Sequence, residues 1–196
     1  MPRPRVRGCI PGARDGHTAC VIGKYMYIFG GYEEETDRFS QDVYVLNLEN
    51  FEWNFLPVNG SPPLWRDFHS AVAIDGKMFV FGGRSDVNGP YHTQNEIYHN
   101  EIKYLDTNTC TWIMPNTKGN HPIGRRSHSS FVYKRKIYIF GGYNGTLKRH
   151  LNDLYQFDPE TQIWTCVYTN GKKPCPRRRQ CCCVVRDRLF LFGGTR

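Results

Sequence analysis

Short apolar segments separated by turn residues recur along the entire chain. Segments such as TACVI, YMYIF, DVYVL and EWNFL are rich in β-branched and aromatic residues, and Gly, Asn and Asp lie between them. Such segments are typical of β-strands joined by tight turns. No segment has the apolar spacing of an amphipathic helix. The pattern therefore predicts an all-β fold.

One sequence unit is repeated four times. The triplet Phe-Gly-Gly occurs at 29–31, 81–83, 140–142 and 192–194, so its first glycines are spaced 52, 59 and 52 residues apart. A proline, an arginine and a histidine precede each triplet at fixed offsets: Pro11, Arg14 and His17; Pro63, Arg66 and His69; Pro122, Arg125 and His128; and Pro174 and Arg177, with Gln180 in place of the histidine. An acidic residue and a tryptophan follow the first three triplets: Asp42 and Trp53, Glu101 and Trp112, and Asp153 and Trp164. A period near 50 residues indicates stacked structural repeats.

This unit resembles the kelch repeat, in which four antiparallel strands form one blade of a β-propeller. We therefore expect about three and a half four-stranded blades, as in a fragment or short isoform of a six-bladed propeller. The expected division is a tail of a preceding blade at 1–10, repeats at 11–62, 63–121 and 122–173, and a truncated repeat at 174–196. The second repeat carries a long loop at 84–100.

Composition and charge narrow the classes of partner. The 196 residues carry a formal net charge of +8, with basic clusters at Arg3, Arg5 and Arg7 and at 177–179. This positive charge favours acidic proteins or carboxylates as partners. Nucleic acid, encountered in chromatin, is a less favoured partner. No apolar run has the length of a membrane span, so we expect no membrane partner. The eight cysteines, without a preceding signal sequence, indicate reduced thiols in the cytoplasm and also the nucleus.

Catalytic and metal-binding patterns are weak in this sequence. His17, His69 and His128 recur once per repeat, which favours hydrogen bonds to neighbouring loops over metal binding. The adjacent thiols at 181–183 would point to alternate faces of a strand, so they would not converge on one metal. No G-x-S-x-G elbow and no Cys–Tyr–His set of a copper oxidase is evident. We expect no cofactor and no catalysis, and an enzyme is the third alternative.

The residues that vary within the rigid repeat define a candidate binding site. The R-x-x-H segment opens the first strand of each blade and Phe-Gly-Gly closes the antiparallel second strand, so both should line one mouth of the propeller. The candidate peptide-binding residues are Arg84, Arg126, Ser127, Arg66, Asp67, Asp15, Tyr32, Tyr143, Arg178 and Arg179. The first arginine of each segment, such as Arg66, is also expected to brace one blade against the next.

The charges of this mouth are expected to be polarised. Asp15 and Asp67 would form one side, and Arg126, Arg178 and Arg179 the other, with Arg84 at the junction. Arginine forks suit a terminal carboxylate, while aspartates suit a nearby basic side chain. The loop at 84–100 would overhang the mouth, with Tyr91 or His92 as a wall. We therefore predict that the mouth binds an extended peptide.

Several strings are not dictated by the general repeat: PGARDGH, WRDFHSA with FGGR, RRSHS with FGGYN, and PRRRQCCC with LFGGT. Together they resemble the kelch substrate receptors of cullin-2-type ubiquitin ligases. The resemblance implies that the partners are C-terminal tails of substrate proteins ending in glycine, and that Arg84, Arg126 and Ser127 form the carboxylate pocket. It implies elongin and cullin-2 ligase components as partners of the full-length protein only. The alternative is a scaffold or chromatin-associated interaction propeller with a meiotic role.

Overall fold

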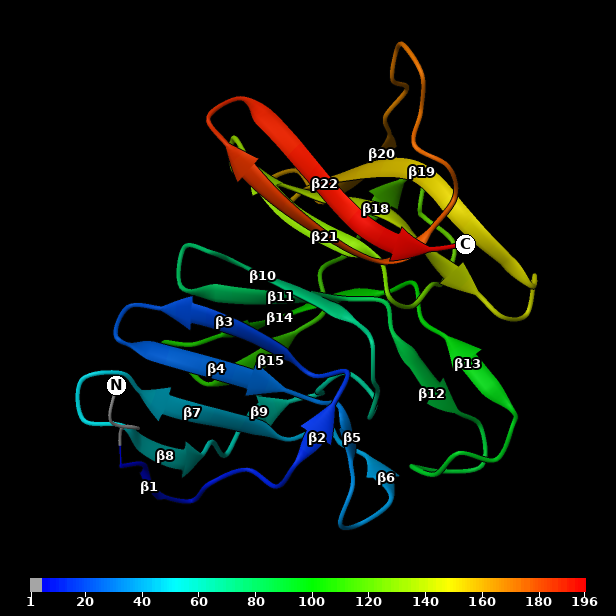
Figure 1. Ribbon diagram of the computed structural model, residues 1–196. Coiled ribbons are helices and arrows are strands. Elements are labelled where there is room, and N and C mark those ends of the chain that lie inside the picture. Colours follow the sequence, from blue (N-terminus) through cyan, green and yellow to red (C-terminus); the bar gives the residue numbers. More distant parts are fainter. Residues whose placement is uncertain (1–4) are drawn as a thin grey trace.

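The computed structural model describes residues 5–196, so Arg3 and the beginning of the predicted tail at 1–10 lie outside the described residues. The described residues form strands, turns and irregular segments (Figure 1). Among them there is no helix that is long and apolar enough to cross a membrane. Successive sheets are stacked side by side, and the first strands of neighbouring sheets contact one another. The predicted all-β kelch architecture is thereby confirmed.

The first three sheets are complete four-stranded antiparallel blades. Their strands, in order from the first strand outward, are β3 (Thr18–Ile22), β4 (Tyr25–Phe29), β7 (Val43–Asn47) and β8 (Glu52–Phe55); β10 (Ser70–Ile74), β11 (Lys77–Phe81), β14 (Ile102–Asp106) and β15 (Thr111–Ile113); and β17 (Ser129–Tyr133), β18 (Lys136–Asn144), β19 (Arg149–Asp158) and β20 (Ile163–Cys166). The fourth blade has a single hairpin, β21 (Arg178–Val185) and β22 (Arg188–Thr195). These strands are the predicted three and a half blades.

A short parallel segment lines the outer edge of each complete blade. These segments are β1 (Arg7–Gly8) beside β8, β9 (Asn59–Gly60) beside β15, and β16 (Lys118–Gly119) beside β20. Within the segment 1–10, which is expected to be the tail of a preceding blade, Arg7 and Gly8 pair with β8 of the first complete blade, just as Asn59 and Gly60 pair with β15 of the second. Gly8 has a positive φ, and a Cβ there would collide with the Trp53 carbonyl.

The core lies between the blades and is built largely from aromatic residues. The phenylalanine of each of the first two Phe-Gly-Gly triplets packs against the tryptophan of the next blade. The ring centroids are 5.0 Å apart for Phe29 and Trp112 and 5.2 Å apart for Phe81 and Trp164. These side chains are almost completely buried. A blade therefore buries its apolar faces only by stacking on its neighbours.

Additional short strands extend the blades at the end where Phe-Gly-Gly lies. They are β2 (Arg14–Asp15), β5 (Tyr32–Glu33) and β6 (Arg38–Phe39) in the first blade, and β12 (Arg84–Asp86) and β13 (Glu96–Tyr98) in the second. In Figure 1 they lie on the right of the molecule. The predicted loop at 84–100 thus contains an antiparallel hairpin, β12–β13, in addition to its irregular part.

The motif arginines brace each blade internally with their side chains. The guanidinium of Arg66 donates to the carbonyl of Gly82 at 2.8 Å and to Glu101, both in its own blade. The carbonyl of Arg66 instead accepts a hydrogen bond of 2.8 Å from the amide of Gly31 in the preceding blade. The expectation of an inter-blade side-chain brace is therefore corrected: the side chain acts within the blade and the main chain acts between blades.

Candidate functional site

The mouth is built on a chain of backbone hydrogen bonds that runs from blade to blade. The third residue of each R-x-x-H segment has a positive φ: Gly16, Phe68, Ser127 and Arg179. The amide of Phe68 donates to the carbonyl of Gly16 at 2.8 Å, Ser127 to Phe68 at 2.9 Å, and Arg179 to Ser127 at 2.8 Å. We call these four residues the inner ring. Because the main chain holds the ring, its side chains are free to differ.

The second residue of each segment lies beside the residue that follows the glycine pair. Asp15 pairs with Tyr32, Asp67 with Arg84, Arg126 with Tyr143, and Arg178 with Thr195. The antiparallel strands therefore bring the two predicted sets of residues to one mouth, as expected.

Arg84 is already engaged by two carboxylates of this chain. Its Nε and Nη2 atoms lie 3.1 and 2.6 Å from the two oxygens of Asp67, and its Nη1 lies 2.8 Å from Glu96. Burial opposes the ionisation of Glu96, yet hydrogen bonds from Tyr98 and Arg84 hold its pKa below the ordinary value. Asp67 is 1% exposed, so it faces Arg84 and not an open mouth. Asp15, in contrast, is exposed.

Arg126, Arg178 and Arg179 form the basic half of the mouth. Within residues 5–196 these three side chains have no ion pair with a carboxylate. The buried Nε atoms of Arg126 and Arg178, and the hydroxyl of Ser127, have no hydrogen-bond partner in the described part of the chain. Burial lowers the pKa of Arg178, and the neighbouring charges of Arg126 and Arg179 lower it further. Such a cluster is set up to receive an anion.

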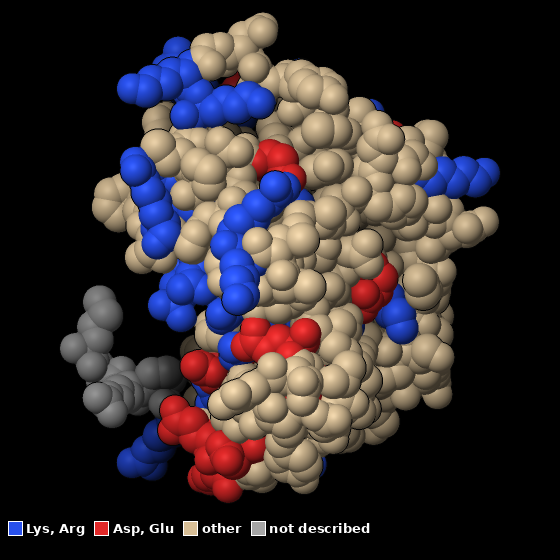
Figure 2. All heavy atoms as spheres, turned by 90° about the vertical axis from the view of Figure 1, so that its right-hand side faces the viewer, with Lys and Arg blue, Asp and Glu red and all other residues tan. Residues whose placement is uncertain are grey.

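Figure 2 shows the face of the molecule that carries the mouth. Lysine and arginine side chains run through the upper and middle part of this view, and aspartate and glutamate side chains gather mainly in the lower part. The face is therefore polarised in charge. Some carboxylates at this end of the blades are nonetheless neutralised by arginines of the first two blades, such as the buried Glu33 by Arg14 at 3.0 Å.

Aromatic rings support the arginines of the mouth. The ring centroid of Phe68 lies 5.4 Å from the guanidinium carbon of Arg84, 5.8 Å from that of Arg126 and 5.9 Å from that of Arg179. Tyr143 lies 5.6 Å from Arg126, and its ring is 4.8 Å from Arg178. Cation–π contacts of this kind orient the guanidinium groups without neutralising their charge.

Phe68 is the principal residue of the mouth that sequence reasoning missed. The signal that could have found it was its place in the column Gly16, Phe68, Ser127, Arg179, of which only the last two were chosen as candidates. Glu96 was missed as well, because its position depends on how the β12–β13 hairpin closes.

The irregular part of the loop at 84–100 folds back over the first blade. The amide of Phe39 donates to the carbonyl of Pro90 at 2.6 Å. The ring of His92 lies 4.5 Å from that of Tyr32 and 4.4 Å from that of Phe39, so His92 forms a wall of the mouth. Tyr91 is 53% exposed and has no such contact among the described residues.

Asp86 fixes the conformation of this loop. Its two carboxylate oxygens accept hydrogen bonds from the hydroxyl of Thr93 at 2.6 Å and from the amides of Asn88, Thr93 and Asn95 at 3.0, 2.8 and 3.3 Å. Burial opposes the ionisation of Asp86, but these donors lower its pKa to about 2. A charged Asp86 therefore holds the loop in place at neutral pH.

Arg66 lies beneath the mouth and not on its surface. It is 1% exposed, and its carbonyl and carboxylate partners lie in its own blade. The structure thus gives Arg66 a supporting role. Tyr32 is half-buried, and its hydroxyl donates to Asp37 at 2.6 Å, so the ring and not the hydroxyl is presented to the mouth.

Two of the three repeated histidines, His69 and His128, join neighbouring blades. The Nε2 atom of His69 lies 2.8 Å from the hydroxyl of Thr18, and that of His128 lies 2.7 Å from the hydroxyl of Ser70. Gln180 takes the same place in the fourth blade and donates to the carbonyl of Phe140 at 3.0 Å. Burial, and then the charge of Arg125, lower the pKa of His128 to about 3. These inter-blade hydrogen bonds agree with the predicted structural role.

The three adjacent cysteines alternate as expected. Cys181 and Cys183 are exposed, whereas Cys182 lies against the third blade with its sulfur 3.7 Å from the carbonyl of Ser130. No group of three or more His, Cys, Asp or Glu side chains suited to a metal ion occurs in residues 5–196.

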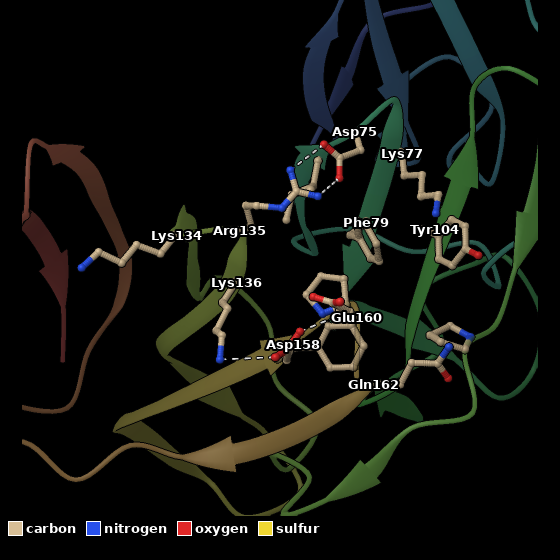
Figure 3. A pocket seen from close by; sticks show the side chains of 14 residues that line it. Asp75, Lys77, Phe79, Tyr104, Lys134, Arg135, Lys136, Asp158, Glu160 and Gln162 are labelled. Atoms are coloured by element: carbon tan, nitrogen blue, oxygen red, sulfur yellow. Dashed lines mark hydrogen bonds and ion pairs between the residues drawn. The ribbon is translucent and has the colours of Figure 1, made fainter.

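A cavity lies away from the mouth, between the second and third blades, where the strand turns meet (Figure 3). Its volume is about 560 Å³, and Phe79 and Tyr104 line it. Arg135 and Asp75 form a two-bond ion pair across the blades, and Lys136 lies 3.3 Å from Asp158. Since most of the charges in this cavity are paired, it is a weaker candidate for an anion site than the mouth.

Comparison with known proteins agrees with this architecture. Residues 1–194 match the family model described as the KLHDC2/KLHL20/DRC7 Kelch-repeats domain. The chain is 54% identical to kelch domain-containing protein 3 of Homo sapiens and of Mus musculus, over 98% of this chain and 50% of each relative. It is 32% identical to host cell factor 2 of Homo sapiens, over 97% of this chain and 25% of that protein.

The chain spans about half the length of kelch domain-containing protein 3. The families matched are kelch-repeat proteins, which are generally non-catalytic interaction modules. The chain therefore belongs to the kelch-repeat family and is a protein-interaction module similar to kelch domain-containing protein 3.

Proposed function

We propose that this chain supplies the peptide-binding mouth of a substrate receptor for a cullin-RING ubiquitin ligase, and that the mouth binds proteins through a C-terminal glycine. The carboxylate of the peptide would lie against Arg126, Arg178 and Arg179, within reach of the Ser127 hydroxyl. Elongin and cullin-2 ligase components would bind elsewhere in the full-length protein.

The observation that carries the proposal is the set of polar groups without partners at the basic half of the mouth. Three guanidinium groups lie close together without a carboxylate in the described residues, and the hydroxyl of Ser127, which is 8% exposed, has no hydrogen-bond partner there. Burying such groups is costly unless a ligand completes their hydrogen bonds. A terminal carboxylate offers two acceptor oxygens, which suits guanidinium forks.

Arg84 would have a different role from the carboxylate-binding one that the family resemblance implies. Asp67 and Glu96 neutralise its charge, so Arg84 would orient the acidic side of the mouth and contribute less to the carboxylate. The exposed Asp15 remains available to a basic group that precedes the glycine. The mouth would thus bind the terminal carboxylate of the peptide and also select for a basic residue next to it.

The test is a binding titration of the chain with a peptide that ends in Arg-Gly. The same peptide with an amidated end, and one extended by a single residue, serve as controls. We expect Arg126→Gln and Arg178→Gln each to weaken binding by about 10- to 100-fold, since a hydrogen bond to a charged group contributes roughly 1.5–3 kcal/mol. Arg188→Gln, at an exposed position in the fourth blade, should leave binding unchanged.

Equal affinity for free and amidated peptides would refute the carboxylate proposal. The scaffold alternative predicts binding to duplex DNA that persists in the Arg126→Gln protein. A general anion site would be indicated if the unmodified chain bound free and amidated peptides equally and the Arg126→Gln variant lost both peptide and DNA binding. This result would also overturn the proposal.

A further inference from the structure

A histidine lies in the basic half of the mouth, beside the ring of Tyr143. His150 and Tyr143 are partners in the β18–β19 pair, and partners in antiparallel strands place their side chains on the same face. The two ring centroids are 4.9 Å apart. The guanidinium carbons of Arg178 and Arg126 lie 4.8 and 5.6 Å from the centroid of the same tyrosine ring. Three side chains that can carry a positive charge therefore lie around one aromatic ring.

The imidazole of His150 has no acidic partner in the described part of the chain. Its Nε2 atom is buried and has no hydrogen-bond partner there. The one ion pair between a histidine and a carboxylate in residues 5–196 joins His99 to Glu101 at 3.5 Å. His128 is buried as well, but its Nε2 atom lies 2.7 Å from the hydroxyl of Ser70. The packing of the blades thus gives the Nε2 atom of His150 no partner of the kind that buried polar atoms usually have.

The charged groups that face His150 are positive. They are Arg126, from the segment before β17, and Arg178, from β21. Within β19 itself, Arg149 is exposed and Asp153 is already engaged in an ion pair. Burial, then the charge of Arg178 and then that of Arg126, lower the pKa of His150 below its ordinary value of 6.5. The ring is therefore neutral at pH 7 in the unliganded protein.

The neighbouring tyrosine brings no negative charge to this site. The ring of Tyr98 lies 6.5 Å from that of Tyr143. Burial, and then the hydrogen bond to Glu96, raise the pKa of Tyr98 to about 12, so its hydroxyl stays protonated at neutral pH. Glu96 itself is paired with Arg84 at 2.8 Å. Neither group therefore offsets the charges of the arginines beside His150.

A bound carboxylate would change the charge balance at His150. An opposite charge within roughly 4–6 Å favours the charged form of a titratable group, and it also offsets the like charges that disfavour that form. A carboxylate held against Arg126 and Arg178 brings a negative charge to the side chains around Tyr143. Protonation of His150 then adds a further positive charge to the site as the ligand binds.

We propose that His150 is a further residue of the anion-binding site in the mouth and takes up a proton when a peptide carboxylate binds against Arg126 and Arg178. This inference rests on the proposed function, because it takes the C-terminal carboxylate of a peptide as the ligand. The pKa of His150 is then higher in the complex than in the free chain. Binding therefore strengthens as the pH falls between these two pKa values, and it does not depend on this residue's protonation above both.

The test measures the affinity of the chain for the peptide that ends in Arg-Gly at pH 7.5 and at pH 5.5. The terminal carboxylate, with a pKa of about 3.5, stays ionised over this range. We expect the affinity at pH 5.5 to exceed that at pH 7.5 by at least about threefold. Calorimetry at pH 6 in MES and in bis-Tris should give different binding enthalpies, since the proton is taken from the buffer. In proton NMR spectra, the Hε1 resonance of His150 should titrate at a higher pH with saturating peptide than without it.

Histidine variants assign the proton to one residue. The affinity of His150→Gln should not rise as the pH falls, because glutamine cannot take up the proton. His121→Gln is the matched control, since His121 is exposed and contacts the hydroxyl of Thr117 at 2.9 Å, and it should keep the pH dependence. His92 also titrates, but its ring packs against Tyr32 on the acidic side of the mouth. His92→Gln should therefore keep the gain in affinity at pH 5.5.

The outcomes separate this inference from the proposed function. A preference for the free over the amidated peptide, with equal affinity at pH 7.5 and pH 5.5, would overturn the role of His150 and leave the carboxylate proposal standing. A gain at low pH that persists in His150→Gln or disappears in His92→Gln would also overturn it. Equal binding of free and amidated peptides, or no binding of either, would overturn both proposals.

Discussion

Replacement of the buried motif arginine Arg125 by methionine should strongly destabilise the protein. Arg125 is 0% exposed, and its guanidinium donates to the carbonyls of Ile123 at 3.1 Å and Gly141 at 3.0 Å and forms a fork with Asp153. Methionine has a similar length and remains apolar, so it retains much of the packing but none of the hydrogen bonds. The variant therefore isolates the polar role of the side chain.

The size of the effect follows from these contacts. Breaking a buried ion pair by removing one partner costs about 3–5 kcal/mol. The Asp153 side chain is 31% exposed, so water can solvate part of its carboxylate and the cost falls toward the lower limit. The two carbonyls left without a donor add roughly 1 kcal/mol or more each. We expect a total loss of about 3–5 kcal/mol in the free energy of unfolding.

Urea denaturation followed by circular dichroism would measure this loss. Arg177→Met is the matched control, since Arg177 occupies the same motif position without a carboxylate in the described chain, and it should cost under about 1.5 kcal/mol. Arg38→Met, which removes an exposed partner of Glu33, should cost about 0–1 kcal/mol. If Arg125→Met were no more destabilising than Arg38→Met, the internal brace would not stabilise the blade and the reasoning would fail.

Three further predictions concern the blade junctions and the loop. Gly82→Ala should lower the free energy of unfolding by more than about 2 kcal/mol, because the new Cβ would lie 2.7 Å from the His128 ring. Gly193→Ala, at a similar φ but with open space around it, should lower it by about 1 kcal/mol. Equal losses for the two variants in chemical denaturation would contradict this prediction. The pKa of His128 is lowered to about 3 in the folded protein, so the unfolded protein binds a proton at this residue more readily. The contribution of His128 to stability is therefore present above pH 6.5 and is lost as the pH falls from 6.5 toward 3. Denaturation at pH 7 and pH 5 should show a smaller pH dependence for His128→Gln than for the unmodified chain. Asp86→Ala should speed amide exchange across 87–95 and leave exchange in β17 unchanged, and unaltered exchange in the loop would refute its anchoring role.

Much of the fold could be predicted from the repeat, because its recurring glycines and tryptophans have structural roles. The glycine pairs have positive φ, and a Cβ at the second glycine would meet the backbone of the R-x-x-H segment, so these positions require glycine wherever the blade forms. The tryptophans fill the space between blades. Spacing alone therefore predicted the strands, the blade count and the side of the molecule where the variable residues meet.

The charge state of the mouth could not be predicted in the same way. The sequence places Arg84 beside Asp67 through strand pairing, but the partner Glu96 arrives through a hairpin whose path depends on Asp86 and its four donors. Burial of Asp67 likewise depends on the stacking of whole blades. These long-range effects turned an expected free arginine into a neutralised one.

The role of Phe68 also depended on three-dimensional placement. Its neighbours Arg84, Arg126 and Arg179 come from three different blades, and sequence spacing gives no measure of how closely their side chains converge on one ring. The side-chain brace of Arg66 likewise differs from the expectation of a brace between blades, because its guanidinium pairs with Glu101 of its own blade. The pairing of strands was predictable, and the convergence of side chains was not.

The inner ring separates the evolution of binding from the evolution of folding. Since amide-to-carbonyl bonds hold its four positions, the same backbone accommodates glycine, phenylalanine, serine and arginine. A mutation at one of these positions changes the chemistry that a ligand meets while the strands around it stay in register. Related propellers could therefore acquire new ligands by single substitutions, and an engineer could reprogram this mouth by varying the same four residues.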